Sequence, residues 1–196
     1  MDDENVESAG FGIRLAGRLI DYAPTFVASL MSGVVLAFIA GVIAVSRKPP
    51  DSEVLDPMMT KSVLTVLGTL LATTFYHAFS ESIGGASLGK RLLGLEVVDE
   101  DLQPATLTQG WKRNLAFFVD GFFFGLVAYN AMEKSPTRQR IGDRWAKTRV
   151  VMRRSLPPAL RRPTPIFVFA FFGAMGIAVE TSIVAYVCSY WLLTGG

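Results

Sequence analysis

The chain has little of the chemistry on which most enzyme sites depend. Its 196 residues include one cysteine, Cys188, and one histidine, His77. A single cysteine forms no internal disulfide, and these two residues alone make no zinc-type metal cluster. Nucleophile-elbow, zinc-protease and paired-cysteine patterns are also missing. The residues therefore predict a protein that is not an enzyme and that carries no metal or cofactor.

One glycine-rich stretch has part of the pattern of a nucleotide-binding loop. Gly84 is followed five residues later by Gly89 and then by Lys90. Arg91 stands where a Ser or Thr would bind magnesium, and a helix is expected before the loop where such sites have a strand. The pattern therefore indicates a tight turn.

Charge is nearly absent from three long parts of the chain. Residues 22–45 carry no charge, residues 62–79 have Tyr76 and His77 as their only ionisable side chains, and residues 165–193 contain one acid, Glu180. A helix needs about 20 apolar residues to cross a bilayer. These runs predict three transmembrane helices, so we expect an integral membrane protein.

The remaining charge is distributed unevenly. Residues 1–9 form an acidic tail where a secretory signal would be basic, so the first apolar run is expected to stay in the mature protein. Residues 133–163 carry ten of the 19 Lys and Arg residues. This loop is expected on the cytoplasmic side, where it is either solvated or in contact with anionic lipid. Few aromatic residues interleave its charges, which argues against nucleic-acid binding.

Residues 115–132 are marginal for a membrane crossing. The run is 18 residues long and holds Asp120, followed by a glycine, near its middle. It is either a single crossing or a re-entrant helical hairpin. The hairpin places sixteen of the 19 Lys and Arg residues on the cytoplasmic side, whereas the crossing places thirteen there. The positive-inside rule therefore favours the hairpin, with the N-terminus cytoplasmic and the C-terminus outside.

The predicted fold is an all-α membrane protein with a small β element. It has three transmembrane helices, the hairpin (or a fourth span), and two short cytoplasmic strands at 93–98 and 148–152 that meet on one side of the bilayer. A helix is expected at 11–22, kinked by Pro24, and another begins near Thr106. A turn is expected at 47–51.

Several charged residues next to or within apolar sequence need partners. Arg14 and Asp21 are seven residues apart and share a helix face, and Arg18 is spaced to pair with Asp21. Asp120 must face protein, water or an arginine. His77 and Glu81 share a face of the second apolar helix and, with Tyr76, could extend a proton-accepting network. Glu180 is the deepest acid, and its protonated form could be held by Thr181 or Ser182.

Three stretches together resemble the RDD family of small integral membrane proteins. They are GFGIRLAGRLID at 10–21, GASLGKRLLGLEVVD at 85–99 and RQRIGDRWAKTRVV at 138–151. The resemblance covers about residues 10–152. The family takes its name from one arginine and two aspartates, which correspond here to Arg14, Asp21 and, by preference, Asp143, with Asp120 as the rival. The resemblance implies that Arg14, Asp21 and Asp143 form one charged cluster at the cytoplasmic ends of the helices.

The resemblance also implies a domain division and two functions. The division is an acidic tail at 1–9, an RDD-like membrane domain at 10–154, a basic proline-rich linker at 155–163 and an additional transmembrane helix at 164–196. One implied function is transport of small cations or protons, alone or as a transporter subunit. The other is a non-catalytic scaffold or assembly factor in the cytoplasmic membrane, whose 134–162 loop docks a partner or anionic lipid. Either suggests a homo-oligomer or a membrane-protein partner.

Overall fold

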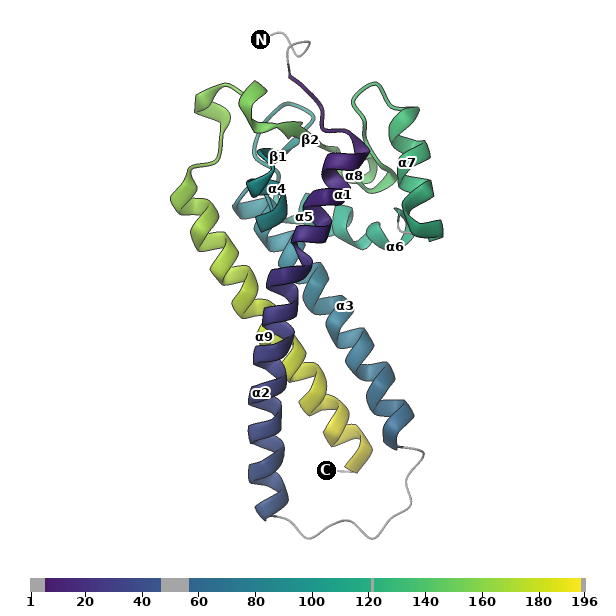
Figure 1. The fold of residues 1–196 in the computed structure, drawn as a ribbon, viewed down its shortest axis with the longest axis vertical. Coiled ribbons are helices and arrows are strands. Elements are labelled where there is room, and N and C mark those ends of the chain that lie inside the picture. The colour runs from purple at the N-terminus through teal and green to yellow at the C-terminus, as the bar shows by residue number, and fades with distance from the viewer. Residues whose placement is uncertain (1–5, 47–56, 121, 195–196) are drawn as a thin grey trace.

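The computed structural model describes residues 6–46, 57–120 and 122–194. It is mostly helical, with a small two-stranded sheet, and three long helices extend from a head of short elements (Figure 1). The acidic residues 1–5 and the turn predicted at 47–51 lie outside the described residues. The elements are α1 (Phe11–Ile20), α2 (Tyr22–Ser46), α3 (Pro57–Ile83), α4 (Leu88–Leu92), β1 (Leu95–Asp99), α5 (Leu107–Leu115), α6 (Phe117–Asp120), η2 (Phe122–Gly125), α7 (Leu126–Glu133), α8 (Ile141–Ala146), β2 (Thr148–Met152), η3 (Arg153–Ser155), η4 (Pro158–Leu160) and α9 (Thr164–Thr194).

The three apolar runs form the three long helices α2, α3 and α9, of 25, 27 and 31 residues. Among the described residues, one stretch, Pro158–Ala185, is long and apolar enough to cross a membrane. The structure therefore contains one candidate membrane-spanning helix, which is centred on α9.

The long helices pack through small side chains. Ala28, Ala72, Ala174 and Ala178 are buried with Tyr76 where α2, α3 and α9 meet. Large apolar side chains of these helices face outward instead, among them Phe26, Phe38, Leu67, Phe169 and Phe172. Small residues at the contact let helix backbones approach closely, which is how helices associate when their outer surface is apolar.

The two strands pair antiparallel, with Val97 opposite Val150. The prediction that they meet is therefore confirmed, although β1 spans Leu95–Asp99 where 93–98 was expected. Ser8 of the N-terminal segment forms a bridge to Val151 on the other side of β2. The sheet and the segment before α1 thus tie the start of the domain to its end.

The 115–132 stretch is three short helical pieces, α6, η2 and α7, not one continuous helix. Gly125 begins α7 with a φ of +86°, a backbone conformation that suits glycine and turns the chain. In Figure 1 α6 and α7 form one side of the head. Before them, α5 begins as predicted at Thr106, whose hydroxyl and Gln109 form a capping box.

The first helix breaks earlier than predicted. The expected kink was at Pro24, but α1 ends at Ile20 and α2 begins at Tyr22, so the break falls at Asp21. At this break the Asp21 carboxylate accepts hydrogen bonds from the Ser87 hydroxyl, just before α4, and from the Gly89 N–H within α4.

Candidate functional site

Arg14 projects from α1 into the head and has partners on three other segments. Its Nη1 donates to Asp143 Oδ2 at 2.6 Å, and its Nε donates to the Ala9 carbonyl at 3.0 Å. Its Nη2 donates to the Arg138 carbonyl at 2.9 Å. This side chain therefore joins the N-terminal segment to α8 and to the turn before it.

Asp143 lies at the centre of the head and is 0% exposed. Besides Arg14, it pairs with Arg140 Nε at 3.3 Å and Arg113 Nη1 at 3.6 Å. Burial alone would raise the pKa of Asp143, but the charges of Arg113, Arg14 and Arg140 hold it well below its usual value. The carboxylate is therefore ionised throughout the neutral range.

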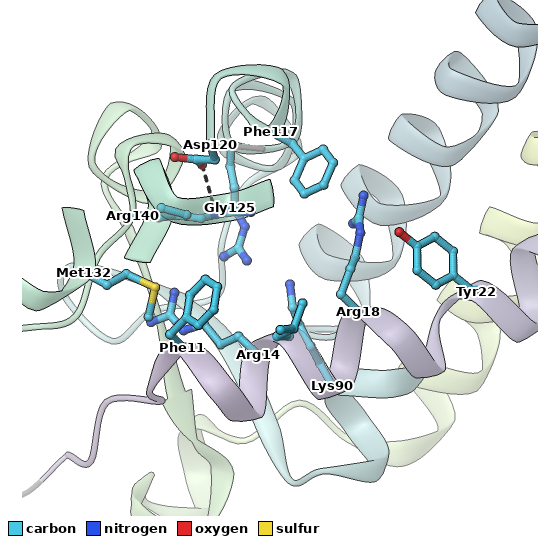
Figure 2. A pocket seen from close by; sticks show the side chains of 13 residues that line it. Phe11, Arg14, Arg18, Tyr22, Lys90, Phe117, Asp120, Gly125, Met132 and Arg140 are labelled. Atoms are coloured by element: carbon cyan, nitrogen blue, oxygen red, sulfur yellow. Dashed lines mark ion pairs between the residues drawn. The ribbon is translucent and has the colours of Figure 1, made fainter. Parts of the chain in front are cut away.

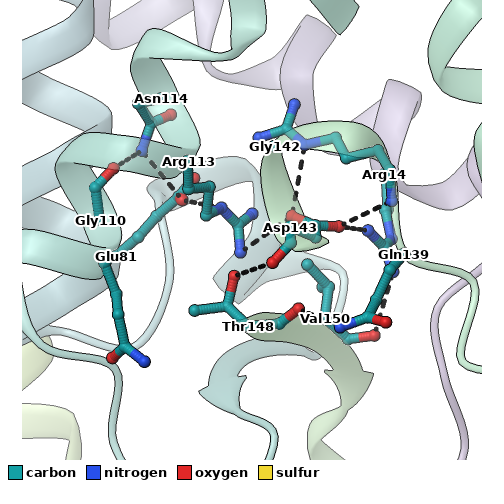
Figure 3. Close-up of polar contacts among 12 residues, drawn as sticks. Arg14, Glu81, Gly110, Arg113, Asn114, Gln139, Gly142, Asp143, Thr148 and Val150 are labelled. Atoms are coloured by element: carbon teal, nitrogen blue, oxygen red, sulfur yellow. Dashed lines mark hydrogen bonds and ion pairs between the residues drawn. The ribbon is translucent and has the colours of Figure 1, made fainter. Parts of the chain in front are cut away.

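Arg113 connects Asp143 to a second buried acid. It comes from α5, is 1% exposed, and places Nε 3.0 Å from Glu81 Oε2 on α3 (Figure 3). Lys90 of α4 donates to the other oxygen of Glu81, and Asn114 lies 3.4 Å from Oε2. A continuous series of contacts thus runs from Arg14 through Asp143 and Arg113 to Glu81. We call Arg14, Lys90, Arg113, Glu81 and Asp143 the charge network.

Asp21 stands apart from Arg14 and Asp143. Its Oδ1 accepts from the Gly89 backbone N–H at 2.8 Å and from the Tyr76 hydroxyl at 3.2 Å. Its Oδ2 accepts from the Ser87 hydroxyl at 2.5 Å. Arg14 and Asp143 therefore bind each other as the predicted cluster requires, but Asp21 is not part of that cluster. Its hydrogen bonds instead connect the end of α1 to the turn after α3.

The rival aspartate, Asp120, lies beside Asp143. Its two oxygens accept from the backbone N–H groups of Ile141 and Gly142 at 3.1 and 3.2 Å, so it caps the start of α8. Arg140 Nε is 3.4 Å from Asp120 Oδ2 and pairs with Asp143 as well. The expectation that Asp120 faces protein and an arginine is confirmed.

The secondary candidates have different surroundings. Arg18 lies 4.2 Å from the centre of the Phe117 ring and, among the described contacts, forms no ion pair with Asp21. His77 Nδ1 is 3.6 Å from Glu81 Oε1 and 4.0 Å from Asp21 Oδ2, so it sits between the two groups.

Glu180 is exposed on α9, and its expected partners are engaged elsewhere. The hydroxyls of Thr181 and Ser182 donate to the carbonyls of Ile177 and Ala178 in the same helix. Among the described contacts neither hydroxyl donates to Glu180, and the prediction that one of them accepts from its protonated form stays a prediction.

The packing of α1 on α4 depends on two glycines. A Cβ at Gly89 would collide with the Gly17 carbonyl, and a Cβ at Gly17 would touch the backbone of Lys90. The close approach lets the Gly89 N–H reach Asp21 and brings Lys90 into contact with α1. This stretch, which has part of a nucleotide-loop pattern, is thus a packing surface.

Sequence reasoning missed three basic members of the site, namely Lys90, Arg113 and Arg140. It also missed Glu96, which is buried in β1 and binds Arg153 Nη1 at 2.5 Å and the Arg162 backbone N–H at 2.6 Å. The signal was the need of Glu81 and Glu96 for cations, because buried acids are seldom left unpaired.

A cavity of about 310 Å³ lies beside the network, between α1 and the pieces that follow α5 (Figure 2). Arg18 and Lys90 point into it from one side, and Phe117 and Asp120 lie on the other. The basic residues that line it are Arg14, Arg18, Lys90, Arg113 and Arg140, and Asp120 is the one acid among the lining residues.

The fold and the site define a mostly helical protein in which a head of buried ion pairs adjoins long apolar helices. Comparison with protein families matches the RDD family over residues 8–147, and the chain belongs to that family. It is also 30% identical over 152 residues to the uncharacterized protein YxaI of Bacillus subtilis (strain 168), an alignment that covers 73% of this chain and 96% of the relative. No solved structure matches it.

Proposed function

We propose that this chain is a non-catalytic, multi-pass protein of the cytoplasmic membrane that acts as a scaffold or assembly factor. The charge network carries this proposal. Arg14 and Arg113 are buried and both bind Asp143, which is 0% exposed. A carboxylate that is buried and paired with arginines supports a structural role. A carboxylate that transports an ion or proton must instead be accessible to it.

The proposed topology has three membrane-spanning helices, α2, α3 and α9. Their large apolar side chains face outward and their alanines face one another, which suits a lipid environment. The head, including both strands, then lies on the cytoplasmic side and the C-terminus outside. The 115–132 pieces lie at the bilayer surface in this arrangement, with Phe118, Phe123 and Leu126 exposed.

Transport of small cations or protons is the second candidate, favoured by the family resemblance. The series from Asp21 through His77 to Glu81 offers titratable groups at the end of α3. Against it, the cavity at the head is lined by five basic residues and one acid, a charge that repels cations. The geometry therefore supports the scaffold more strongly.

The test separates the two functions with one pair of variants. Arg14→Ala should lower the amount of folded protein in membranes and abolish recovery of a stoichiometric membrane-protein partner in mild detergent. Asp21→Asn should leave ion flux in proteoliposomes unchanged. Intrinsic cation or proton flux that Asp21→Asn abolishes, from a chain that purifies without a partner, would reject the scaffold.

A further inference from the structure

The cavity beside the network has more positive charge than its neighbouring acids neutralise. Its five basic residues have three carboxylates within ion-pair distance among the described residues, those of Glu81, Asp120 and Asp143. The basic groups therefore outnumber the carboxylates by two in a partly enclosed space. A cavity of one charge sign attracts ligands of the other.

Of the five basic residues, Arg18 is the one most available to bind an anion. Among the described contacts it has no carboxylate partner, and its guanidinium stacks on the Phe117 ring at the cavity wall. Stacking fixes the plane of the guanidinium and leaves its N–H groups free to bind an anion. In Figure 2 this side chain points into the space between α1 and Phe117.

Lys90 adds a second group that a bound anion would stabilise. Burial, together with the nearby charge of Arg113, lowers the pKa of Lys90 to about 7 despite its contact with Glu81. A negative charge placed in the cavity would favour the ammonium form. Lys90 enters the cavity from the same side as Arg18, which allows both side chains to reach one ligand.

The mouth of the cavity is apolar. Among the apolar residues that line the cavity, Leu15 and Tyr22 are exposed and mark its mouth, whereas Met132 is buried. Leu19 lies exposed on the same helix, and the surface continues along the outward face of α2. A ligand that enters here meets hydrocarbon before it meets the arginines.

We propose that the cavity binds a phosphate-type anion between Arg18 and Lys90, and that its apolar mouth selects one carried by a lipid headgroup. The inference rests on the proposed membrane position of α2, because only that position brings the mouth to the bilayer surface. Arginine and lysine are the side chains that bind phosphate oxygens through charge-assisted hydrogen bonds. The acyl chains would lie along the exposed face of α1 and α2.

This site differs from the basic loop that composition alone suggests. Within that loop Arg140, Arg153 and Arg154 pair with carboxylates, and Arg161 and Arg162 donate to backbone carbonyls. These five residues are thus engaged in contacts within the protein. The cavity is built mainly from residues outside the loop, and its excess of basic groups lies in a partly enclosed space.

The experiment titrates the full chain, purified in mild detergent, with dioctanoyl phosphatidylglycerol, dioctanoyl phosphatidylcholine or inorganic phosphate, and follows binding by native mass spectrometry. We expect wild type to prefer phosphatidylglycerol, and Arg18→Gln to weaken that binding about tenfold, the loss of one charge-assisted hydrogen bond. Arg144→Gln is the matched control, since Arg144 is exposed on α8 and does not line the cavity. Leu15→Glu, at an exposed position, should weaken binding too by placing an acid at the mouth.

The outcomes separate the sources of the anion. Binding of inorganic phosphate that Arg18→Gln weakens, with no gain from acyl chains, would retain the anion site but overturn its lipid selectivity. Equal binding of both lipids, or equal losses in Arg18→Gln and Arg144→Gln, would overturn the site. Because Arg18 lies outside the charge network, Arg18→Gln should keep wild-type abundance and partner recovery, so this proposal can fail while the scaffold stands.

Discussion

The head and the long helices bury opposite kinds of side chain. In the head, Arg113, Asp143 and Glu81 are almost completely inaccessible, and each carries a charge. Where α2, α3 and α9 meet, the buried residues are mostly alanines, and phenylalanines lie on the outside. The head is thus specified by directional ion pairs, whereas the helices are specified by close backbone contact. Mutations that remove charge should therefore act on the head alone.

The largest effect is expected from Arg113→Ala. This change leaves Glu81 and Asp143 with fewer counter-charges in a buried region, and breaking such a pair costs about 3–5 kcal/mol. The free energy of unfolding in detergent, measured by denaturant titration, should fall by that amount. Arg113→Lys should retain part of it, because a single ammonium keeps the charge but cannot reach both acids. An unchanged free energy of unfolding in Arg113→Ala would show that the ion pairs of Arg113 do not stabilise the head.

A smaller loss is expected from Gly89→Ala, which tests backbone packing inside the head. The new Cβ would collide with the Gly17 carbonyl and push α4 from α1, at a cost of about 1–3 kcal/mol. Gly12→Ala is the control on α1, because a Cβ added at Gly12 would meet nothing within 4 Å. It should be neutral or stabilising in the same unfolding measurement. Equal effects of the two changes would contradict close packing of α1 on α4.

The long helices could be predicted from the sequence better than the ion pairs of the head. The long helices and the pairing of two strands were predictable, because apolar runs and short β-branched segments are local signals. Arg14 and Asp143, which are 129 residues apart, were grouped only through the resemblance to a family. Arg113 was not predicted, because nothing local distinguishes it from Lys112 beside it. Asp21 was misplaced, since spacing shows a shared helix face but not which neighbour approaches it.

The stability of the folded protein should decrease modestly in acid, and the decrease should report the ion pairs of Asp143. The pKa of Asp143 is lower in the folded chain than its usual 3.8, so its stabilisation is complete above about pH 4 and is lost as the pH falls below that value. Asp143→Asn should be less stable than wild type at neutral pH. Its thermal midpoint should then fall less between about pH 4 and pH 2 than that of wild type. Parallel pH profiles for the two proteins would show that the ion pairs of Asp143 with its arginines contribute nothing to stability.

The smallest effects are expected at exposed charges. Arg154 pairs with Glu7 at 2.9 Å, but both side chains are more than half exposed, so Arg154→Ala should cost less than about 1 kcal/mol. Glu180→Gln should change neither stability nor abundance, because Glu180 is exposed on α9. A loss as large as that of Arg113→Ala at either position would mean that exposed charge also specifies the fold.

The central claim is that Arg14 and Asp143 stabilise the head by binding each other, and a double-mutant cycle tests it most directly. The free energies of unfolding of Arg14→Met, Asp143→Leu and the double variant would be compared with wild type in one detergent. Arg14→Met removes the 2.6 Å partner of Asp143, and Asp143→Leu leaves the buried Arg14 without its carboxylate, so the double variant should lose about 2 kcal/mol less than the two single losses together. Strictly additive losses would contradict the claim, because they would mean that the two residues act independently.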